Sequence, residues 1–206
     1  MKTNAELRAE ARAHLGGNIF GNNWLVGLLA VVIYTIVASL LSYIGIGLLF
    51  MGPVTVGLAA FFLAATRYGS VDIAHMTYAV KTGERFIRTL LVGILTTIFT
   101  FLWALLFVIP GIVKTYAYAL APYLAIERED LDARGCLDES QRLMNGNKMQ
   151  LFLLDFSFVG WYILGLLCCG IGVYFVEPYH HAARAEFYNA IVGAPVDAAI
   201  DVDVSK

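Results

Sequence analysis

Residues 24–66, WLVGLLAVVIYTIVASLLSYIGIGLLFMGPVTVGLAAFFLAAT, contain no Asp, Glu, Lys or Arg. A helix that crosses the ~30 Å hydrocarbon core of a bilayer needs about 20 consecutive apolar residues, so this stretch is long enough for two such helices. Gly45, Gly47 and the pair Gly52-Pro53 interrupt it near its middle and predict a tight reversal. A soluble helical protein would break such a run with a polar face at every turn. The stretch therefore predicts a membrane hairpin.

The same pattern occurs twice more along the chain. No charged residue lies between Arg88 and Lys114, or between Asp155 and Glu177. The whole sequence of 206 residues is 59% hydrophobic and only 15% charged, against about 25% charged in soluble domains. We expect an all-α, polytopic membrane helical bundle of about six transmembrane helices, arranged as three hairpins. The predicted segments are 24–44, 47–66, 89–109, 111–126 (kinked by Pro122), 149–167 and 171–191.

Basic residues indicate how the bundle is threaded. Of the 14 Lys and Arg residues, only Lys114 lies outside the termini and the two long connections between hairpins. The three reversals at 45–52, 110–111 and 168–172 carry no charge. Lys and Arg favour the cytoplasmic side of a membrane, so both termini and the long connections are expected there, in a multi-pass protein of the cytoplasmic membrane. The N-terminal MKTNAELRAEARAHLGGN mixes acidic and basic residues and does not read as a cleaved secretory signal.

Amphipathic patterns lie between the predicted hairpins. In residues 131–144, LDARGCLDESQRLM, apolar residues recur at helical spacing with charges on the opposite side, which predicts a helix at the membrane surface. Residues 71–80 show a weaker form, and residues 6–15 an Ala-rich polar one. These cytoplasmic amphipathic surface helices belong to a predicted single integral membrane domain over 1–192, followed by an acidic, disordered cytoplasmic tail over 193–206.

Regular spacing of glycines suggests a threefold organisation. Gly21, Gly83 and Gly146 are 62 and 63 residues apart, and each is followed by a hydrophobic hairpin. The unit would be a surface helix, a glycine, a span, a turn and a second span. Since all membrane spans resemble one another in composition, this spacing favours three hairpins without establishing a common ancestor for them.

Several ionisable residues fall inside the apolar segments, where charges are costly and often functional. They are Lys114, Asp155, Glu177, His180, His181 and Arg184.

Helical rise predicts how these groups pair. At about 1.5 Å per residue, Lys114 and Glu177 lie roughly 6 and 8 Å below the outer surface, so they could form an ion pair. Asp155 lies about 10 Å from the inner surface, where Arg184 or a histidine of the sixth segment would suit it better. Two interpretations stay open. One is a polar cavity between helices, as in a transporter or a lipid-binding groove. The other is that Lys114 snorkels and Asp155 bonds its own neighbourhood.

A metal site is not expected. Glu177 and His181 are one helical turn apart, but His180 and His181 are adjacent and point about 100° apart on a helix. A zinc hydrolase helix carries two histidines one turn apart, and no third ligand is evident here. No catalytic motif occurs, so we predict no enzyme and no cofactor. The net charge of −2 gives no reason to expect nucleic acid.

Other residues have expected packing roles. The three cysteines, Cys136, Cys168 and Cys169, form no disulfide or metal-ligand pattern. Gly93, and Gly160 with Gly165, are expected to allow close helix packing. Trp24, near the start of the first segment, fits an interfacial anchor.

Motifs from residue 110 onward resemble a known family. IPGIVKTYAYALAPYLAIE, MNGNKMQLFLLDFSFVGW, GIGVYFVEPY and AEFYNAI occur in order and resemble the bacterial integral membrane proteins of domain-of-unknown-function family 975. That family is similar to the membrane domain attached to some glycerophosphodiester phosphodiesterases. The resemblance implies an all-helical polytopic protein of bacterial cytoplasmic membranes without an assigned activity. Its pattern positions include Pro110, Gly111, Pro122, Tyr123, Gly146, Trp161, Gly172, Pro178 and Tyr179. Glu177, His180 and His181 are not part of it.

Three hypotheses of function remain. The first is non-enzymatic binding of a lipid or small amphiphile, or an accessory role in membrane transport or export. The alternative is a small transporter or channel-like subunit of an oligomer. A second alternative is an intramembrane metalloenzyme. The expected partners are membrane lipids, with a homo-oligomer or another membrane protein as further candidates.

Overall fold

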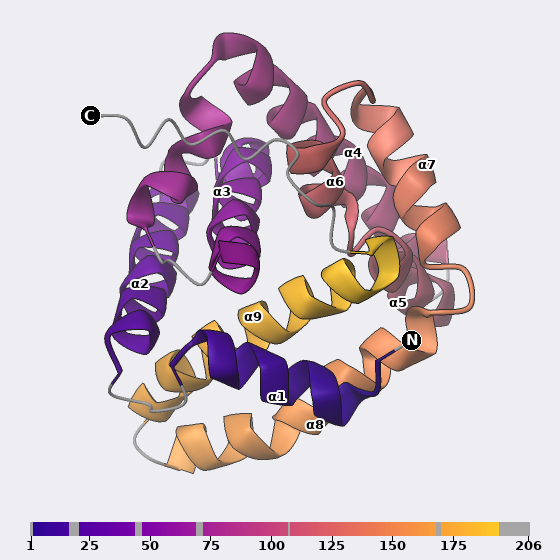
Figure 1. Ribbon diagram of the computed structural model, residues 1–206. Helices are drawn as coiled ribbons and strands as arrows, with labels where there is room; N and C mark the ends of the chain where they lie inside the picture. Colours follow the sequence, from indigo (N-terminus) through magenta and orange to yellow (C-terminus); the bar gives the residue numbers. More distant parts are fainter. Residues whose placement is uncertain are drawn as a thin grey trace.

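The computed structural model describes residues 2–16, 21–43, 47–68, 72–106, 108–167 and 170–193, and within them every regular element is helical (Figure 1). The α-helices are α1 (Asn4–His14), α2 (Asn22–Tyr43), α3 (Gly47–Tyr68), α4 (Gly83–Leu106), α5 (Val108–Ala117), α6 (Ala121–Glu127), α7 (Ala133–Leu143), α8 (Lys148–Leu167) and α9 (Ile171–Val192). A 3₁₀-helix, η1 (Ile73–Val80), lies between α3 and α4.

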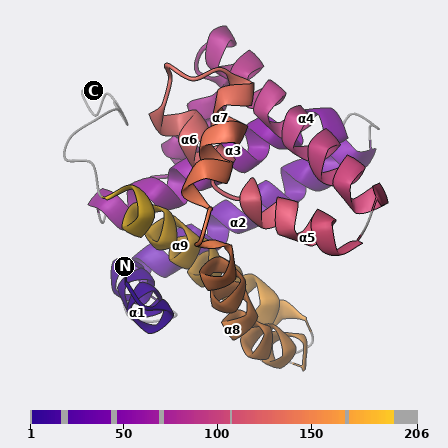
Figure 2. The ribbon, with the colours of Figure 1, turned by 90° about the vertical axis from the view of Figure 1, so that its right-hand side faces the viewer.

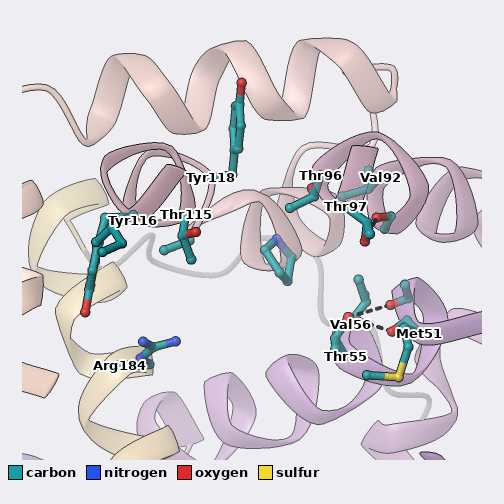
Figure 3. A pocket seen from close by; sticks show the side chains of 15 residues that line it. Met51, Thr55, Val56, Val92, Thr96, Thr97, Thr115, Tyr116, Tyr118 and Arg184 are labelled. Atoms are coloured by element: carbon teal, nitrogen blue, oxygen red, sulfur yellow. Dashed lines mark hydrogen bonds between the residues drawn. The ribbon is translucent and has the colours of Figure 1, made fainter. Parts of the chain in front are cut away.

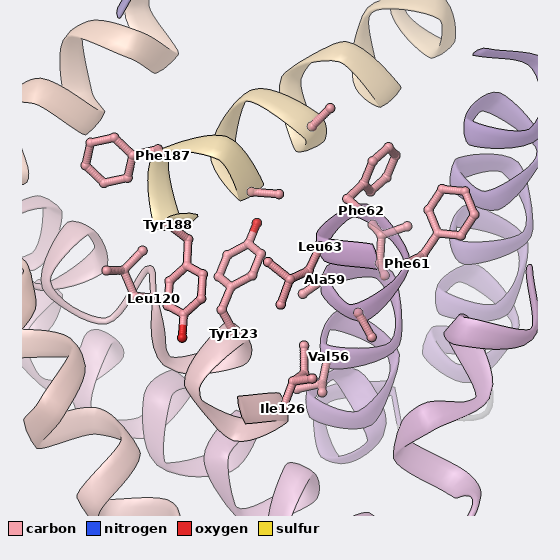
Figure 4. Close-up of a cluster of buried hydrophobic side chains, with 14 of the residues drawn as sticks. Val56, Ala59, Phe61, Phe62, Leu63, Leu120, Tyr123, Ile126, Phe187 and Tyr188 are labelled. Carbon is pink, nitrogen blue, oxygen red and sulfur yellow. The ribbon is translucent and has the colours of Figure 1, made fainter. Parts of the chain in front are cut away.

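Helix α3 forms the centre of the core. It contacts α2, α4, α6, α9 and η1. Of the residues in its long apolar stretch, 72% are buried. Phe61, Phe62 and Leu63, three successive residues on different sides of the helix, are each 0% exposed. A helix that is apolar all round must be buried all round, which explains why the other helices gather about this one (Figure 4).

Helix α9 is the second core element. It runs between α1 and α8 on one side and α2 and α3 on the other (Figure 1). Its small residues Ala182, Ala183 and Ala185 are fully buried, and so are Phe187 and Tyr188. The Tyr188 ring stacks on Tyr123 of α6 with centroids 5.1 Å apart (Figure 4).

Glycines let two pairs of helices approach so closely that their backbones are in contact. A Cβ placed on Gly52 of α3 would lie 2.9 Å from the Cα of Gly93 in α4, closer than real Cβ atoms come to such a neighbour. Gly165 and Gly172 make the same kind of contact between α8 and α9. The expected packing role of Gly93 and Gly165 is confirmed, whereas Gly160 faces open space.

Among the described residues, four helices are long and apolar enough to cross a membrane: Asn22–Leu40, Phe50–Tyr68, Gly83–Leu105 and Lys148–Leu167. The predicted fourth segment, 111–126, is not one kinked helix. Instead α5 ends at Ala117 and α6 begins at Ala121, with Pro122 in its first turn. Proline lacks a backbone N–H and clashes with the preceding turn, so it starts a helix more readily than it continues one. Helix α9 matches the predicted sixth segment in length, but it is not among the four.

The predicted surface helices are helices that pack onto the bundle. Helix α7 buries Cys136, Leu137 and Ser140 against α4 and α6, and α1 lies along α9 (Figures 1 and 2). The 3₁₀-helix η1 lies so close to α3 that a Cβ on Gly57 would collide with the carbonyl of Met76. Cys168, Cys169 and, except for Gly193, the predicted tail 193–206 lie outside the described residues.

Candidate functional site

A pocket of about 560 Å³ opens between α3, α4, α5 and the start of α6. Its walls combine apolar side chains with the hydroxyls of four threonines, and one charged residue lies at its end. Figure 3 shows Arg184 reaching in from α9 on one side, with threonines of α3 and α4 on the other. The lining residues include Met51, Thr55, Val56, Val92, Thr96, Thr97, Thr115, Tyr116, Tyr118 and Arg184.

The threonine hydroxyls differ in what they bond. Thr97 and Thr115 donate to carbonyls one turn back in their own helices, at 2.8 and 3.0 Å, and Thr55 donates to its own helix as well. Thr96 Oγ1 is enclosed and has no hydrogen-bond partner among the described residues. A hydroxyl without a partner costs free energy when it is kept from water, so Thr96 Oγ1 is an unsatisfied polar atom within the pocket wall.

Arg184 is tied to Asp155 of α8. Its Nε donates to Asp155 Oδ1 at 2.9 Å, and its Nη2 donates to Oδ2. The Arg184 side chain is nevertheless 35% exposed, because its outer end lines the pocket. The partner predicted for Asp155 from its depth is therefore confirmed, and the pair lies beside the pocket.

His180 also binds Asp155, and thus extends the cluster away from the pocket. Its Nε2 lies 2.8 Å from Asp155 Oδ1, and its Nδ1 lies 2.9 Å from the hydroxyl of Tyr162. Asp155, His180 and Tyr162 thus form a hydrogen-bonded chain between α8 and α9. Glu177 lies near the Tyr162 end of this chain.

Glu177 and His181 lie one turn apart on α9 and form a local pair. Their closest approach is 3.4 Å, between Glu177 Oε2 and His181 Nε2, and the His181 ring stacks on Phe62 at 5.3 Å. Among the residues that the structure describes, no group of three or more His, Cys, Asp or Glu side chains gathers that could hold a metal ion.

Lys114 and Glu177, for which an ion pair was one possibility, have other partners in the structure. Lys114 Nζ donates to Gln141 Oε1 of α7 at 2.6 Å and lies 5.1 Å from the centroid of the Trp103 ring. The depth argument assumed one span from Gly111 to Ile126. Because the chain leaves its helix at Ala117, Lys114 faces α7 rather than α9.

A second buried charge pair was not predicted. Arg67 of α3 and Glu127 of α6 form an ion pair in which the two side chains are 7% and 8% exposed. Arg67 Nε also donates to Asn189 Oδ1 at 2.9 Å, and Tyr188 donates to Glu127. Arg67 and Glu127 each lie at the end of an apolar segment. A charged residue at such a position is expected from sequence alone to be exposed to water, so its burial was not predicted. No pattern links Arg67 to Asn189, which is 122 positions away.

The residues of the family pattern take mostly structural positions. Gly111 meets Ala104 where α4 and α5 lie closest, and Gly146 has a positive φ of 83°. Pro178 lies inside α9 against Gly27, and Tyr179 packs on Trp24 at 5.9 Å. Trp161 is 47% exposed on α8, and Pro110 lies in α5.

Comparison with known proteins gives one finding. A family described as "Protein of unknown function (DUF975)" matches the chain over residues 1–114 and 105–194. No curated protein and no solved structure matches. The expected similarity to a domain of glycerophosphodiester phosphodiesterases is not found in these comparisons.

Proposed function

The chain belongs to the DUF975 family, whose function is unknown, and we propose that it is a membrane protein that binds a lipid or small amphiphile without catalysing a reaction. The pocket between α3, α4 and α5 carries this proposal. Its volume of about 560 Å³ falls within the roughly 300–1,000 Å³ of small-molecule sites. Apolar walls suit a hydrocarbon chain, and Arg184 at one end of the pocket suits a head group.

The proposed setting is the bacterial cytoplasmic membrane, with both termini on the cytoplasmic side. Helices α2, α3, α4 and α8 are the four candidate spans. In the proposed arrangement of three hairpins, α5 and α6 together return the chain across the membrane, and α9 crosses inside the bundle. The placement of Lys and Arg at the termini and in the long connections supports this orientation.

Occupancy of the pocket can be tested with a substitution that fills it. Thr96→Phe adds an aromatic ring to the pocket wall, whereas Ile98→Phe adds one to an exposed position of the same helix, where Ile98 is 57% exposed. We expect lipid or amphiphile to be released from the purified native protein and from Ile98→Phe, and to be reduced at least severalfold in Thr96→Phe. Mass spectrometry of the released molecules gives the measurement. Equal amounts from both variants, or none from the native protein, would exclude this pocket as a binding site.

The polar chain between α8 and α9 favours a second candidate function, transport as a subunit of an oligomer. Asp155, His180, Tyr162 and Glu177 are ionisable groups that lead away from Arg184 at the pocket, and such groups inside membranes often line ion or substrate pathways. Proton or amphiphile flux into vesicles that contain the purified protein would test this. Flux that does not differ from empty vesicles would leave binding as the function.

A further inference from the structure

We infer that the pocket takes an amphiphile with an anionic head group held by Arg184, and that one proton enters the Asp155–His180 pair when the anion binds. This inference rests on the proposed binding function and adds the class of head group and the coupling to a proton. Three features carry it: the free face of Arg184 in the pocket (Figure 3), the charge balance of the cluster, and the position of His180 between Asp155 and Tyr162.

Arg184 has donors left for a ligand. Its two bonds to Asp155 use Nε and Nη2, and within the described residues Nη1 has no partner. The planar guanidinium can bind carboxylate, phosphate or sulfonate oxygens with parallel N–H donors. Arg184 therefore makes a head-group site at one end of an otherwise largely apolar cavity.

Within the group of Asp155, Arg184 and His180, charge balance favours a cation that accompanies the anion. Asp155 and Arg184 neutralise one another when His180 is uncharged, and Glu177 adds a further negative charge nearby. An anion beside them would leave one net negative charge in a poorly solvated site, which is costly. A proton on His180 restores neutrality. The bound state would hold Asp155, Arg184, a protonated His180 and the anion, two charges of each sign.

His180 is placed to take that proton without losing a contact. In its neutral form, Nε2–H donates to Asp155 and Nδ1 accepts from the Tyr162 hydroxyl, at 2.8 and 2.9 Å. When Nδ1 gains a proton from solvent, it donates to the Tyr162 oxygen instead, and the Tyr162 hydroxyl can turn to Glu177. No covalent bond other than the new N–H forms or breaks. The imidazolium also attracts the Asp155 carboxylate more strongly than the neutral ring does. The attraction between Asp155 and Arg184 is then weaker, and Arg184 is more available to the anion.

The titratable and charged groups near His180 come from α9 itself and from the helices packed against it. Those of α9 itself are Glu177, His181 and Arg184, and those of α8 are Asp155 and Tyr162. Tyr116 of α5 and Tyr123 of α6 face Asp155 and Arg184, and Tyr34 of α2 faces Glu177. Arg12 of α1 lies over Tyr179, and Arg67 of α3 binds further along α9 at Asn189.

His181 is a natural control within the same helix. It is the neighbour of His180, but it pairs with Glu177 and stacks on Phe62. It makes no hydrogen bond to Asp155 among the described residues. Substitution of His181 should therefore leave the proposed coupling intact, while substitution of His180 should remove it.

Calorimetric titration of the detergent-purified protein with two probes tests the inference. Decanesulfonate carries a charge that does not titrate, and decanol has a similar chain without charge. We expect the affinity for decanesulfonate to rise as the pH falls, by up to about tenfold per pH unit, the slope for one coupled proton. Titrations in two buffers of different ionisation enthalpy should show about one proton taken up per anion. The affinity for decanol should not change with pH.

The variants assign the roles. His180→Gln should bind decanesulfonate with an affinity that no longer depends on pH, whereas His181→Gln should behave as the native protein does. Arg184→Gln should lower the affinity for decanesulfonate to that for decanol, and Arg184→Lys, which keeps the charge, should retain part of the preference. Unfolding temperatures of all four variants show which of them are folded, and Arg184→Lys serves if Arg184→Gln is not.

The outcomes separate the inference from the function on which it rests. Binding of both probes with equal affinity, binding of the anion without proton uptake, or retained pH dependence in His180→Gln would overturn the inference and leave the proposed binding function standing. If neither probe binds to the native protein, the pocket is not a site for such amphiphiles and the proposed function itself is wrong.

Discussion

Asp155 is the residue on which the polar cluster depends. One carboxylate accepts hydrogen bonds from Arg184 and from His180, and its own side chain is 14% exposed. Removing its charge would leave the arginine charge without a counterion. Uncompensated buried charges destabilise proteins strongly, although the partial exposure of Arg184 to the pocket reduces this effect.

Asp155→Asn is therefore expected to lower the free energy of unfolding by about 2 kcal/mol. That corresponds to a fall of roughly 5 °C in the unfolding temperature for a chain of this size. Thermal unfolding of the detergent-purified protein measures it. Asp138→Asn, at an exposed position of α7, is the matched control and should not shift the temperature. Equal unfolding temperatures for the two variants would show that Asp155 does not stabilise the fold.

The thiol of Cys136 in α7 is predicted to be unreactive in the folded protein. Cys136 is 0% exposed, and burial raises the pKa of its thiol, an effect that Arg88 only partly opposes. Only the thiolate reacts rapidly with alkylating reagents, so the raised pKa lowers the reactive fraction at neutral pH. In a Cys168→Ser, Cys169→Ser background, alkylation followed by mass spectrometry should be slow until denaturant is added. Labelling as fast as that of a free thiol would contradict the burial of this side chain.

Two residues show the limit of what sequence predicts at this scale. Trp24 was expected at the membrane interface, but it is 5% exposed and its indole N–H donates to the carbonyl of Phe175 at 3.2 Å. For Lys114 an ion pair with Glu177 was one possibility, and Lys114 bonds Gln141 instead. In both cases the partner lies on another helix, and the spacing of apolar residues in the sequence does not show which helices pack together. Asp155 was predicted correctly because its partners lie on the adjacent helix of the same expected hairpin.

At the scale of the elements, the contact between α3 and α4 depends on Gly93. Gly93→Ala should lower the free energy of unfolding by about 1–3 kcal/mol, as overpacking does, because the added Cβ meets the backbone of Gly52. Gly160→Ala in α8 meets nothing within 4 Å and should be neutral or stabilising by up to about 1 kcal/mol, since alanine favours the helix. Chemical unfolding of both variants measures the difference. Similar values would mean that α3 and α4 do not cross so closely.

Most predicted segments match helices of the structure, but one helix begins earlier than predicted and one segment is divided in two. The predicted segments 24–44, 149–167 and 171–191 agree closely with α2, α8 and α9. Helix α4 begins at Gly83, six residues before the predicted segment at 89, because a helix can continue into polar residues where the apolar run has stopped. The break between α5 and α6 was missed because apolar composition alone does not distinguish one helix from two short ones.

At the scale of the whole molecule, the orientation in the membrane is testable by cysteine labelling of intact cells. Lys81→Cys and Asp138→Cys replace exposed residues of the two long connections, and Ile109→Cys replaces a residue that is 75% exposed near an expected outer turn. A reagent that does not cross membranes should label position 109 in intact cells, and positions 81 and 138 only after the cells are opened. The opposite pattern would reverse the proposed topology.

Helix α8 touches chiefly α9 and only sparingly α5 and α1, and together with the adjoining part of α9 it projects from the rest of the molecule (Figure 2). Apolar side chains such as Phe156, Leu164 and Leu166 are 57–68% exposed on it. The sequence predicted the apolar length of this helix, but the way it stands away from α2–α4 depends on tertiary contacts that composition does not encode.

The docking of α1 on α9 sets an order of events during protein synthesis. Leu7 and Ala11 of α1 and its capping residue Leu15 are each 0% exposed. Helix α9, which packs along α1, is translated after every other helix that the structure describes. Asn4 and Gln150 fasten the same end of the chain through bonds to backbone carbonyls, at 3.2 and 2.8 Å. At about 5–20 residues per second, the nascent N-terminus waits roughly ten seconds or more for its partner, and until then α9 cannot cover the apolar side of α1.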